Sequence, residues 1–280
     1  MDDFGALTKS IEAILAIQCA NYKEDYIKRR ISSRMRLTGK EDFRSYLEFF
    51  KDNQAEQESL RNALTINVTK FWRDREVFDI IHKEILPDLI KRKDRIRIWS
   101  AGCATGEEPY TLALMAHDMT RLRPNVQITI YATDIDQEAL RKAKNGIYDK
   151  RVLENLTESQ IRRHFSQKDD GKYEVRAHLK EYIRFSQHDL MSGKAVTGNL
   201  DIILCRNVTI YFTEAQKNEL ARTFHPALVS GGYYVLGKTE FLGRDVEKLY
   251  VPYNSLQKIY RKNDGMQHRS AITARIPARG

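Results

Sequence analysis

Trp99-Ser-Ala-Gly-Cys-Ala-Thr-Gly-Glu-Glu-Pro-Tyr110 is the most informative segment of this 280-residue chain. It follows a strand-like run, and its two glycines, Gly102 and Gly106, allow a tight turn. Pro109 then stands in the first turn of a helix, where its missing N–H costs nothing. The segment therefore predicts a strand, a tight loop that a ligand can approach closely, and a helix.

Two carboxylates, Glu107 and Glu108, stand where this helix begins. In a dinucleotide-binding fold the loop would present free N–H groups to a pyrophosphate at that place. A pair of carboxylates would repel a phosphate but attract the ammonium group of an aminoacyl ligand. The two glycines alone do not identify a ligand, because glycine pairs at strand ends also occur in ordinary turns. The acidic pair is what favours a methionine-like ligand over a phosphate.

Strand-like and helical runs alternate on both sides of this segment. We expect strands at 96–100, 127–133, 201–205 and 233–236, and helices at 110–122, 137–144 and 214–228. This alternation indicates βαβ units around a mostly parallel sheet. From 150 to 186 it is interrupted by a short helix at 158–165 and by strands at 172–176 and 182–185, which predict a small antiparallel insert.

The first 66 residues or so have a helical period throughout. Leu7, Ile11 and Ile14 recur at helical spacing, as do Ile27 and Ile31 further on, which predicts a bundle of about four helices. The fold class we expect is α/β, with a helical N-terminal domain before a Rossmann-like domain. The expected boundaries are 1–74 for the helical domain, 75–94 for a linker helix, 95–263 for the Rossmann-like domain with its insert at about 150–186, and 264–280 for a disordered tail.

The composition, with 41% hydrophobic and 30% charged residues, is that of a soluble globular protein. No apolar run approaches the roughly 18 residues that span a membrane, and the acidic start lacks the layout of a signal peptide. Three scattered cysteines form no CxxC and no cluster with histidine in the sequence. They argue against a disulfide framework and a zinc site, so we expect a cytoplasmic protein without membrane insertion.

The net charge of +9 is concentrated at the C-terminus. From Arg261 onward there are five basic residues and one aspartate, so the remaining body is only mildly basic. A nucleic-acid binder shows a broader basic footprint. The charge distribution therefore argues against a nucleic-acid partner.

Polar residues follow the expected strands at the edge where open α/β sheets bind their ligands. Asp134 ends the second strand, where it is positioned to bind ribose hydroxyls, and Asp136 is positioned to cap the next helix, although either could be a simple cap. His188-Asp189-Leu190 could frame an adenine edge. Arg206-Asn207 follows the strand at 201–205, and Cys205 is interpreted as a buried apolar residue rather than a nucleophile.

Four blocks together resemble the chemotaxis receptor methyltransferases, the CheR family. They are Asn67-Val-Thr-Lys-Phe-Trp-Arg73-Asp, SAGCATGEEPYTLA, ATDID and CRNVTIYF, and the similarity covers about residues 7–262 with the blocks in order. The resemblance implies a helical domain, a linker and a methyltransferase domain with an antiparallel subdomain. It further implies transfer of a methyl group from S-adenosylmethionine to a receptor glutamate, which leaves S-adenosylhomocysteine and a γ-glutamyl methyl ester.

The resemblance also assigns residues to the cofactor site. These are Asn67, Thr69, Arg73, Ala101, Gly102, Glu107, Glu108, Asp134, Ile135, Asp189, Leu190, Arg206 and Asn207. It places Tyr211 near the transferred methyl group. The sequence departs from the family pattern at Asp189, where asparagine is frequent, at Phe71-Trp72, and at Lys238, where histidine or serine is frequent.

The chemistry implied needs neither a general base nor a metal. Glutamate, with a reference pKa near 4.3, is already ionised at neutral pH. The task of the enzyme is positioning and desolvation. Holding the two reactants in the right geometry can lower the activation barrier by about 7–11 kcal/mol. We expect Arg73 to orient the attacking carboxylate and Tyr211 to line the path of the methyl group.

The expected partner is the acidic methylation helices in the cytoplasmic region of chemoreceptors. Between Lys28 and Lys40 there are six basic residues and no acidic one, and Arg29, Arg36 and Lys40 fall opposite the apolar face on a helical wheel. A solvated face normally interleaves both signs, so we interpret these three residues as a docking surface. Some family members bind a receptor C-terminal peptide at the insert by β-augmentation, but the short turn at 167–172 favours the peptide-independent kind. We expect a monomer.

Two alternatives stay open. One is an RNA or DNA methyltransferase on the same fold, although base methylation usually uses an (N/D)PP(Y/F) loop after the fourth strand, and this chain has Cys205-Arg-Asn-Val-Thr209 there, without proline. The other is a non-catalytic module that binds the cofactor as a signal.

Overall fold

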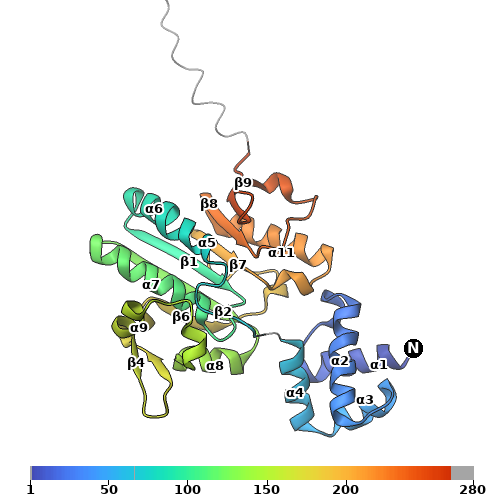
Figure 1. Ribbon diagram of the computed structural model, residues 1–280. Helices are drawn as coiled ribbons and strands as arrows, with labels where there is room; N and C mark the ends of the chain where they lie inside the picture. Colours follow the sequence, from blue (N-terminus) through green and yellow to red (C-terminus); the bar gives the residue numbers. More distant parts are fainter. Residues whose placement is uncertain (1, 66, 266–280) are drawn as a thin grey trace, which may run out of the picture.

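The computed structural model describes residues 2–65 and 67–265, in which a helical bundle lies beside a larger α/β domain (Figure 1). The bundle contains α1 Asp3–Leu15, a short turn of 3-10 helix at Cys19–Asn21, α2 Glu24–Thr38, α3 Phe43–Lys51 and α4 Gln54–Leu64. Their apolar faces enclose a separate core around Ile11, Ile31 and Phe50, which are fully buried. The predicted helical N-terminal domain is confirmed.

Capping residues set the ends of these helices. Asp2, Asp42 and Asn53 accept hydrogen bonds from backbone N–H groups at the starts of α1, α3 and α4. Gly39 ends α2 in the left-handed region, with a φ of 67°, a conformation that costs glycine nothing. Lys40 therefore lies past the end of α2. This corrects the expectation that it continues the helical face of Arg29 and Arg36.

The larger domain is built on a seven-stranded sheet in the order β6-β2-β1-β7-β8-β10-β9. Its strands are β1 Arg95–Ala101, β2 Gln127–Asp134, β6 Ile183–Gln187, β7 Leu200–Cys205, β8 Leu228–Leu236, β9 Tyr250–Asn254 and β10 Ile259–Lys262. The first five in the sheet order are parallel, and β10 and β9 are antiparallel to their neighbours. The predicted Rossmann-like, mostly parallel sheet is confirmed.

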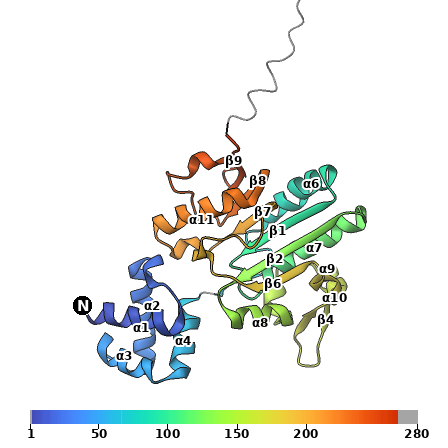
Figure 2. The same ribbon diagram turned by 180° about the vertical axis from the view of Figure 1, so that it is seen from behind.

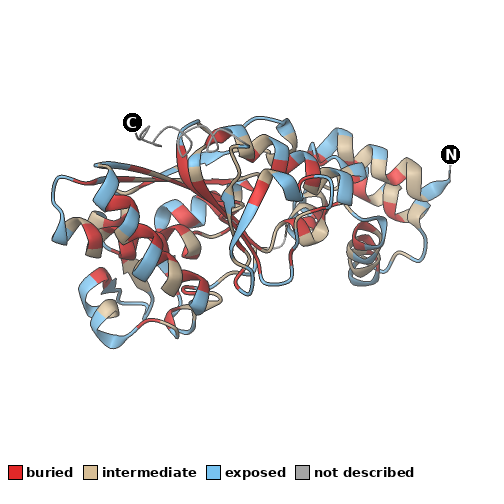
Figure 3. Ribbon diagram, turned by 90° about the horizontal axis from the view of Figure 1, so that it is seen from above, coloured by how far each residue is buried: buried red, intermediate tan, exposed pale blue. Residues whose placement is uncertain are grey.

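Helices cover both faces of this sheet (Figures 1 and 2). Helix α7 Glu107–Leu122 packs on one face and α11 Glu214–Ala227 on the other. Successive residues of β1 contribute to opposite faces, since Ile98 belongs to the core under α7 and Trp99 to the core under α11. Figure 3 shows the buried residues following the sheet and the inner sides of the helices.

The segment expected as a linker helix is part of the α/β domain. It comprises α5 Arg75–Ile80, a π-helical turn at Ile81–Ile85, and α6 Leu86–Arg92. Phe78 and Ile85 are fully buried in the core that α7 shares with the sheet. Pro87 stands in the first turn of α6, and the wide turn before it accommodates a ring that has no N–H and would clash inside a regular helix.

The antiparallel insert is a three-stranded sheet in the order β3-β5-β4. Its strands are β3 Ile147–Tyr148, β4 Phe165–Gln167 and β5 Tyr173–Val175, and α9 Glu158–His164 and α10 Ala177–Lys180 flank them. The strand expected at 182–185 does not belong to this insert. It is β6, which pairs with β2 in parallel, with Ile183 opposite Ile130, because its apolar residues pack into the larger core.

Helix α8 Gln137–Asn145 follows β2. The remaining described elements are four short turns of 3-10 helix, at Lys150–Leu153, Leu190–Ser192, Thr209–Tyr211 and Glu247–Leu249. The hairpin of β9 and β10 was not among the expected elements. Most of β9 is exposed, so it carries no alternation of buried and exposed residues. No helix in the described ranges has the length and apolar character to cross a membrane. Most of the expected tail, from residue 266 on, lies outside the described residues.

Candidate functional site

A cleft lies between the helical bundle and the carboxyl ends of β1, β2, β6 and β7. The chain leaves β1 toward β2 on one side and leaves β7 toward β8 on the other, so the cleft is at the switch point of the sheet. Counted together with the open space at its mouth, the empty volume of the cleft is about 990 Å³. Its place at the carboxyl ends of parallel strands is where open α/β sheets bind their ligands.

Most residues that the sequence assigned to the cofactor site line this cleft. They are Asn67, Thr69, Arg73, Gly102, Glu108, Asp134, Ile135, Asp189, Leu190, Arg206 and Asn207, together with Tyr211. The structure does not bring Ala101 and Glu107 to the wall of the cleft. Ala101 is buried in the core under α11, and Glu107 is buried at the other side of its helix.

The loop after β1 is held tightly against the loop after β7. Gly102 has a φ of 82°, and a Cβ atom there would lie 2.5 Å from Cγ2 of Val208, so only glycine fits. The backbone N–H groups of Gly102 and Cys103 donate to the carbonyl oxygen of Thr133 at 2.8 and 2.9 Å. These donors are consumed within the protein, so the loop does not present them to a phosphate group.

Of the two carboxylates at the start of α7, only Glu108 faces the cleft. Consecutive helical residues point about 100° apart, so the pair cannot share one wall. Glu107 accepts hydrogen bonds from Oγ1 of Thr105 at 2.7 and 3.0 Å, and burial raises its pKa above the usual range. Glu108 accepts from Oγ of Ser100 at 2.8 Å. The acidic character expected of this loop therefore reaches the cleft through Glu108.

Arg206 joins three segments around the cleft. Its side chain is only 1% exposed, and its guanidinium forms ion pairs with Asp74 at 2.7 Å and with Glu108 at 3.1 Å. It also donates to the carbonyl oxygen of Arg73 at 2.9 Å. A buried charge needs this degree of pairing, because removing one partner costs about 3–5 kcal/mol. Arg206 thus fixes the position of Arg73 and Glu108 beside the cleft.

Asp134 ends β2 with its carboxylate at the cleft. One of its oxygens accepts from the N–H of Ala104 at 2.8 Å and the other from the N–H of Asp136 at 2.9 Å. Burial raises the pKa of Asp134, and these backbone hydrogen bonds oppose that rise. Each carboxylate oxygen has a further lone pair, so Asp134 retains acceptor capacity for two ligand hydroxyl groups.

Asp136 caps α8 and also connects the helical bundle to the α/β domain. It accepts from the N–H groups of Glu138 and Ala139, from Oγ1 of Thr65 at 2.9 Å and from Nδ2 of Asn67 at 2.8 Å. Burial on its own would raise the pKa of Asp136, but these hydrogen bonds outweigh it and hold the pKa below the usual range. The capping role expected from the sequence is observed.

The wall beyond β6 combines apolar and polar groups. Leu190 and Ile135 are half-buried and offer apolar surface to the cleft. Asp189 accepts from the N–H of Met191 at 2.8 Å, which fixes the turn at Leu190–Ser192. The backbone N–H of His188 donates to the carbonyl oxygen of Asp134 at 3.0 Å, so this wall is tied to the end of β2.

Glu240 shapes the loop after β7, and the sequence did not identify this role. It is 1% exposed and accepts from the N–H groups of Asn207 at 2.7 Å and Ile210 at 3.1 Å, and from Oγ1 of Thr209 at 2.8 Å. Asn207 adopts a left-handed conformation with a φ of 61°, a strain that these bonds sustain. The sequence alone shows only a glutamate three residues after Gly237. Its role is not visible there, because the loop residues that it contacts are distant in the sequence.

The helical bundle closes one side of the cleft with aromatic residues. The rings of Tyr26 and Tyr211 lie 4.6 Å apart between centroids, and Tyr22 also lines the cleft. The N–H of Lys23 donates to the carbonyl oxygen of Tyr211 at 3.0 Å. Burial raises the pKa of the Tyr211 hydroxyl, so Tyr211 is neutral at physiological pH.

The thiols near the cleft are in an environment that makes them unreactive as nucleophiles. Cys103 and Cys205 are buried, and burial raises the pKa of both thiols well above the usual value. A thiol without thiolate character is a poor nucleophile. The expectation that Cys205 is a buried apolar residue agrees with this environment.

The comparisons with known proteins agree with this geometry. Residues 2–65 match the family model "CheR methyltransferase, all-alpha domain", and residues 67–255 match "CheR methyltransferase, SAM binding domain". The chain is 33% identical to Chemotaxis protein methyltransferase 2 of Vibrio cholerae over 88% of this chain and 85% of that protein. It is 32% identical to the Chemotaxis protein methyltransferase of Borreliella burgdorferi over 94% of each chain, and 35% identical to that of Escherichia coli over 85% and 83%. The chain therefore belongs to the CheR family of S-adenosylmethionine-dependent methyltransferases and contains both of the family's domains.

Proposed function

We propose that this protein methylates glutamate side chains in the cytoplasmic helical region of chemoreceptors, forming glutamyl methyl esters for chemotactic adaptation. The observation that carries the proposal is the cleft at the switch point of the sheet, whose wall combines the carboxylates of Asp134 and Glu108 with Tyr211 at its bundle side. The relatives named as chemotaxis protein methyltransferases support the biological setting. In that setting the protein acts in the cytoplasm, and we propose that it acts as a monomer.

The residues present fit S-adenosylmethionine. The N–H groups of Gly102, Cys103 and Ala104 are hydrogen-bonded within the protein, so they are not offered to a phosphate. The wall of the cleft also contains the carboxylates of Glu108 and Asp134, which suit a ligand that carries positive charge. In this proposal Asp134 binds the ribose hydroxyls, Asp189 and Leu190 contact the adenine, and Glu108 faces the methionyl part. When bound, the cofactor supplies an electrophilic methyl group on a sulfonium leaving group.

The protein's own contribution is to position a carboxylate that is already ionised. Glutamate has a reference pKa near 4.3, so no general base is required at neutral pH. Arg73 lines the cleft, and its guanidinium donates to the carbonyl oxygen of Val68 at 2.8 Å, which leaves other N–H groups for a substrate carboxylate. Tyr211 lines the path between the bundle and the cofactor, and its neutral hydroxyl adds no competing charge.

Helix α2 is the proposed docking surface for the acidic receptor helices. Lys28 and Arg34 are paired with Glu24 and Glu56, whereas Arg29 and Arg36 are exposed. Arg29 lies 5.9 Å from the centre of the Tyr26 ring, which itself contacts Tyr211 of the cleft. Arg29, which forms no ion pair with any described residue, therefore lies close to the cleft, where its charge would speed the encounter with an acidic helix.

Arg30 extends this surface, although the sequence did not single it out. Its guanidinium carbon lies 5.4 Å from the centre of the Tyr26 ring. Its Nε atom is buried and has no hydrogen-bond partner among the described residues. Because its guanidinium lies at the same Tyr26 ring as that of Arg29, we include Arg30 in the proposed docking surface.

The experiment that tests the proposal supplies radiolabelled S-adenosylmethionine with three acceptors in parallel: chemoreceptor cytoplasmic fragments, total RNA, and buffer alone. Label in the receptor fragment alone supports the proposal. Label in RNA would favour a nucleic-acid methyltransferase. Cofactor binding without transfer to any acceptor would favour a non-catalytic sensing module. Receptor fragments with and without their C-terminal peptide show whether the insert tethers that peptide; we expect no dependence.

A further inference from the structure

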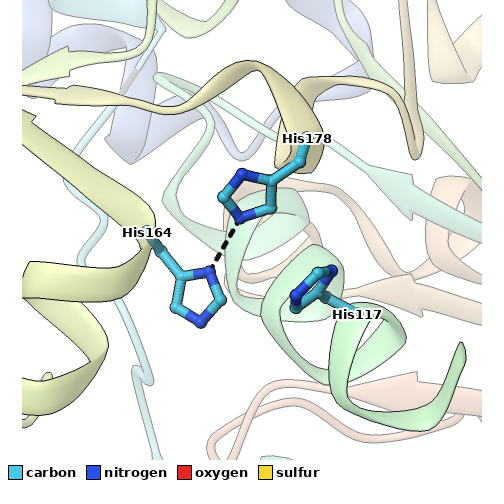
Figure 4. Close-up of side chains that lie close together, drawn as sticks. All are labelled: His117, His164 and His178. Carbon is cyan, nitrogen blue, oxygen red and sulfur yellow. Dashed lines mark hydrogen bonds between the residues drawn. The ribbon is translucent and has the colours of Figure 1, made fainter. Parts of the chain in front are cut away.

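Three histidines that are far apart in the sequence meet beside the insert, and none of them lines the cleft. His117 belongs to α7, His164 ends α9, and His178 belongs to α10 (Figure 4). One ring nitrogen of each lies within 4.8 Å of one ring nitrogen of each of the others. Figure 4 shows the three rings converging, with Nδ1 of His164 and Nε2 of His178 joined at 2.9 Å.

We propose that His117, His164 and His178 form a binding site for a transition-metal ion of the Zn²⁺ type, which joins the insert to α7. Imidazole nitrogen is a preferred ligand of Zn²⁺, and three histidine ligands with a water in the fourth position form a known class of zinc site. Nitrogen ligands about 2.0–2.1 Å from a tetrahedral Zn²⁺ lie about 3.4 Å apart. One observed distance between ring nitrogens is 2.9 Å, and the ligand nitrogens all lie within 4.8 Å of one another. Small rotations of the rings would therefore bring all three to the spacing that the metal needs.

The surroundings favour the neutral form of the rings, which is the form that binds a metal. Burial, with the two other histidines and with Arg163 and Arg121, lowers the pKa of His164 to about 4. Burial also lowers the pKa of His117 and His178. At neutral pH the rings are uncharged and do not repel a metal ion. One of the two hydrogen-bonded nitrogens of His164 and His178 carries a proton, and metal binding would shift that proton to the other nitrogen of its ring.

The site has access and a mechanical role. His164 is 2% exposed, whereas His117 and His178 are half-buried, so solvent can reach the open coordination position. The strands of the insert are two or three residues long and cannot be stable by themselves. Among the described residues the hydroxyls of Thr120 and Tyr182 also meet across this seam at 2.6 Å, and a bound metal would add a stronger link beside them.

The test uses the full-length protein, freed of metal with a chelator and titrated with Zn²⁺ by calorimetry. The variants are H178Q and H117Q, because both side chains are half-buried and glutamine preserves the fold better than a change at the buried His164. The matched control is H225Q, on α11, whose ring contacts the carbonyl oxygen of Asn263. Cooperative thermal unfolding of every metal-free variant establishes that it is folded.

We expect one Zn²⁺ per chain, a rise in the melting temperature on adding Zn²⁺, and binding at least about tenfold weaker in H178Q and in H117Q but unchanged in H225Q. Substituted Co²⁺ should give the visible absorption of a tetrahedral nitrogen site, absent in H178Q. Hydrogen exchange of α10 and β5 should slow when Zn²⁺ is bound. Absence of stoichiometric binding, or binding that H178Q leaves unchanged, would overturn the proposal and leave a hydrogen-bonded cluster of neutral histidines. None of these readouts depends on methyl transfer.

Discussion

Asp134 carries the most specific assignment at the scale of single residues. Its carboxylate is fixed by the N–H groups of Ala104 and Asp136 and still faces the cleft. We predict that Asp134→Ala weakens binding of S-adenosylhomocysteine by about 1.5–3 kcal/mol, the usual loss for charge-assisted hydrogen bonds. Calorimetry measures the effect, and Asp134→Asn, which keeps one acceptor oxygen, serves as the control. Unchanged affinity in the alanine variant would refute the ribose assignment.

The chemistry should depend on neither a thiolate nor a metal. We predict that methyl transfer survives Cys205→Ser, because the thiol is buried, with a raised pKa, and no step uses it. Transfer should also survive EDTA, since a chelator would act on the histidine cluster, which lies outside the cleft. Turnover assays on chelated protein check this. Loss of turnover that one divalent metal restores equally in the wild type and in H178Q, which lacks the proposed histidine site, would contradict the proposed mechanism.

The sequence predicted which residue types surround the cleft better than it predicted their orientation. Glycines, a strand-terminal aspartate and polar residues after each strand have direct sequence signals. The choice between Glu107 and Glu108 depends on helix rotation, which sequence alone does not set to within one residue. The support that Glu240 gives to Asn207 and the pairing of Arg206 are contacts between distant segments. Such contacts have no local pattern.

At the scale of elements, the loop between β1 and α7 depends on close approach to the loop after β7. We predict that Gly102→Ala lowers the free energy of unfolding by more than about 1 kcal/mol, because alanine is strained at a φ of 82° and its Cβ would meet Val208. Denaturant unfolding measures this loss. The double variant Gly102→Ala/Val208→Ala should recover only the part of the lost unfolding free energy that comes from the clash with Val208. Full stability of Gly102→Ala would show that the loop relaxes without cost.

The cap of α8 makes stability depend on pH. The pKa of Asp136 is depressed in the folded protein, so its contribution to stability is present above the unfolded value, near 3.9, and is lost as the pH falls through the lower folded value. We predict that Asp136→Asn lowers stability at pH 7 and flattens the acid dependence below about pH 4. Unfolding titrations of both proteins from neutral to acid pH test this. If the stability of the two proteins fell in parallel as the pH was lowered, other carboxylates would be responsible for the acid dependence.

The elements differ in how well the sequence predicted them, for identifiable reasons. The inner strands β1 and β7 are buried on both faces, so their apolar runs are distinct in the sequence. The strand at 182–185 was assigned to the wrong sheet, because its local pattern does not reveal whether its partner is β5 or β2. The insert's histidines show the same limit, since His117, His164 and His178 come together only through the fold.

At the scale of the whole molecule, the proposed docking surface separates receptor binding from cofactor binding. We predict that replacing Arg29, Arg36 and Lys40 by alanine lowers the rate of receptor methylation and removes most of its salt dependence, because exposed charges act over about 8–10 Å at physiological ionic strength. Affinity for S-adenosylhomocysteine should stay level. The measurement is a salt titration of the methylation rate.

A matched triple variant provides the control for this prediction. Lys91, Lys142 and Lys144 are exposed on the α/β domain, and replacing them by alanine removes the same charge from another surface. This variant should follow the wild-type salt curve. If the salt curves of the wild type and of the Arg29, Arg36 and Lys40 variant were parallel, these three basic residues would be an ordinary solvated surface, and the change in stability would stay within about 0.5 kcal/mol.

The central claim is that the methyl group reaches a carboxylate, and the chemical nature of the product tests it most directly. A chemoreceptor cytoplasmic fragment is methylated with radiolabelled S-adenosylmethionine, treated with mild alkali, and analysed for volatile label and by peptide mass spectrometry. We predict release of the label as methanol and modified peptides in which the methyl group lies on glutamate. Label that resists alkali, or that maps to nitrogen-containing side chains, would contradict the account.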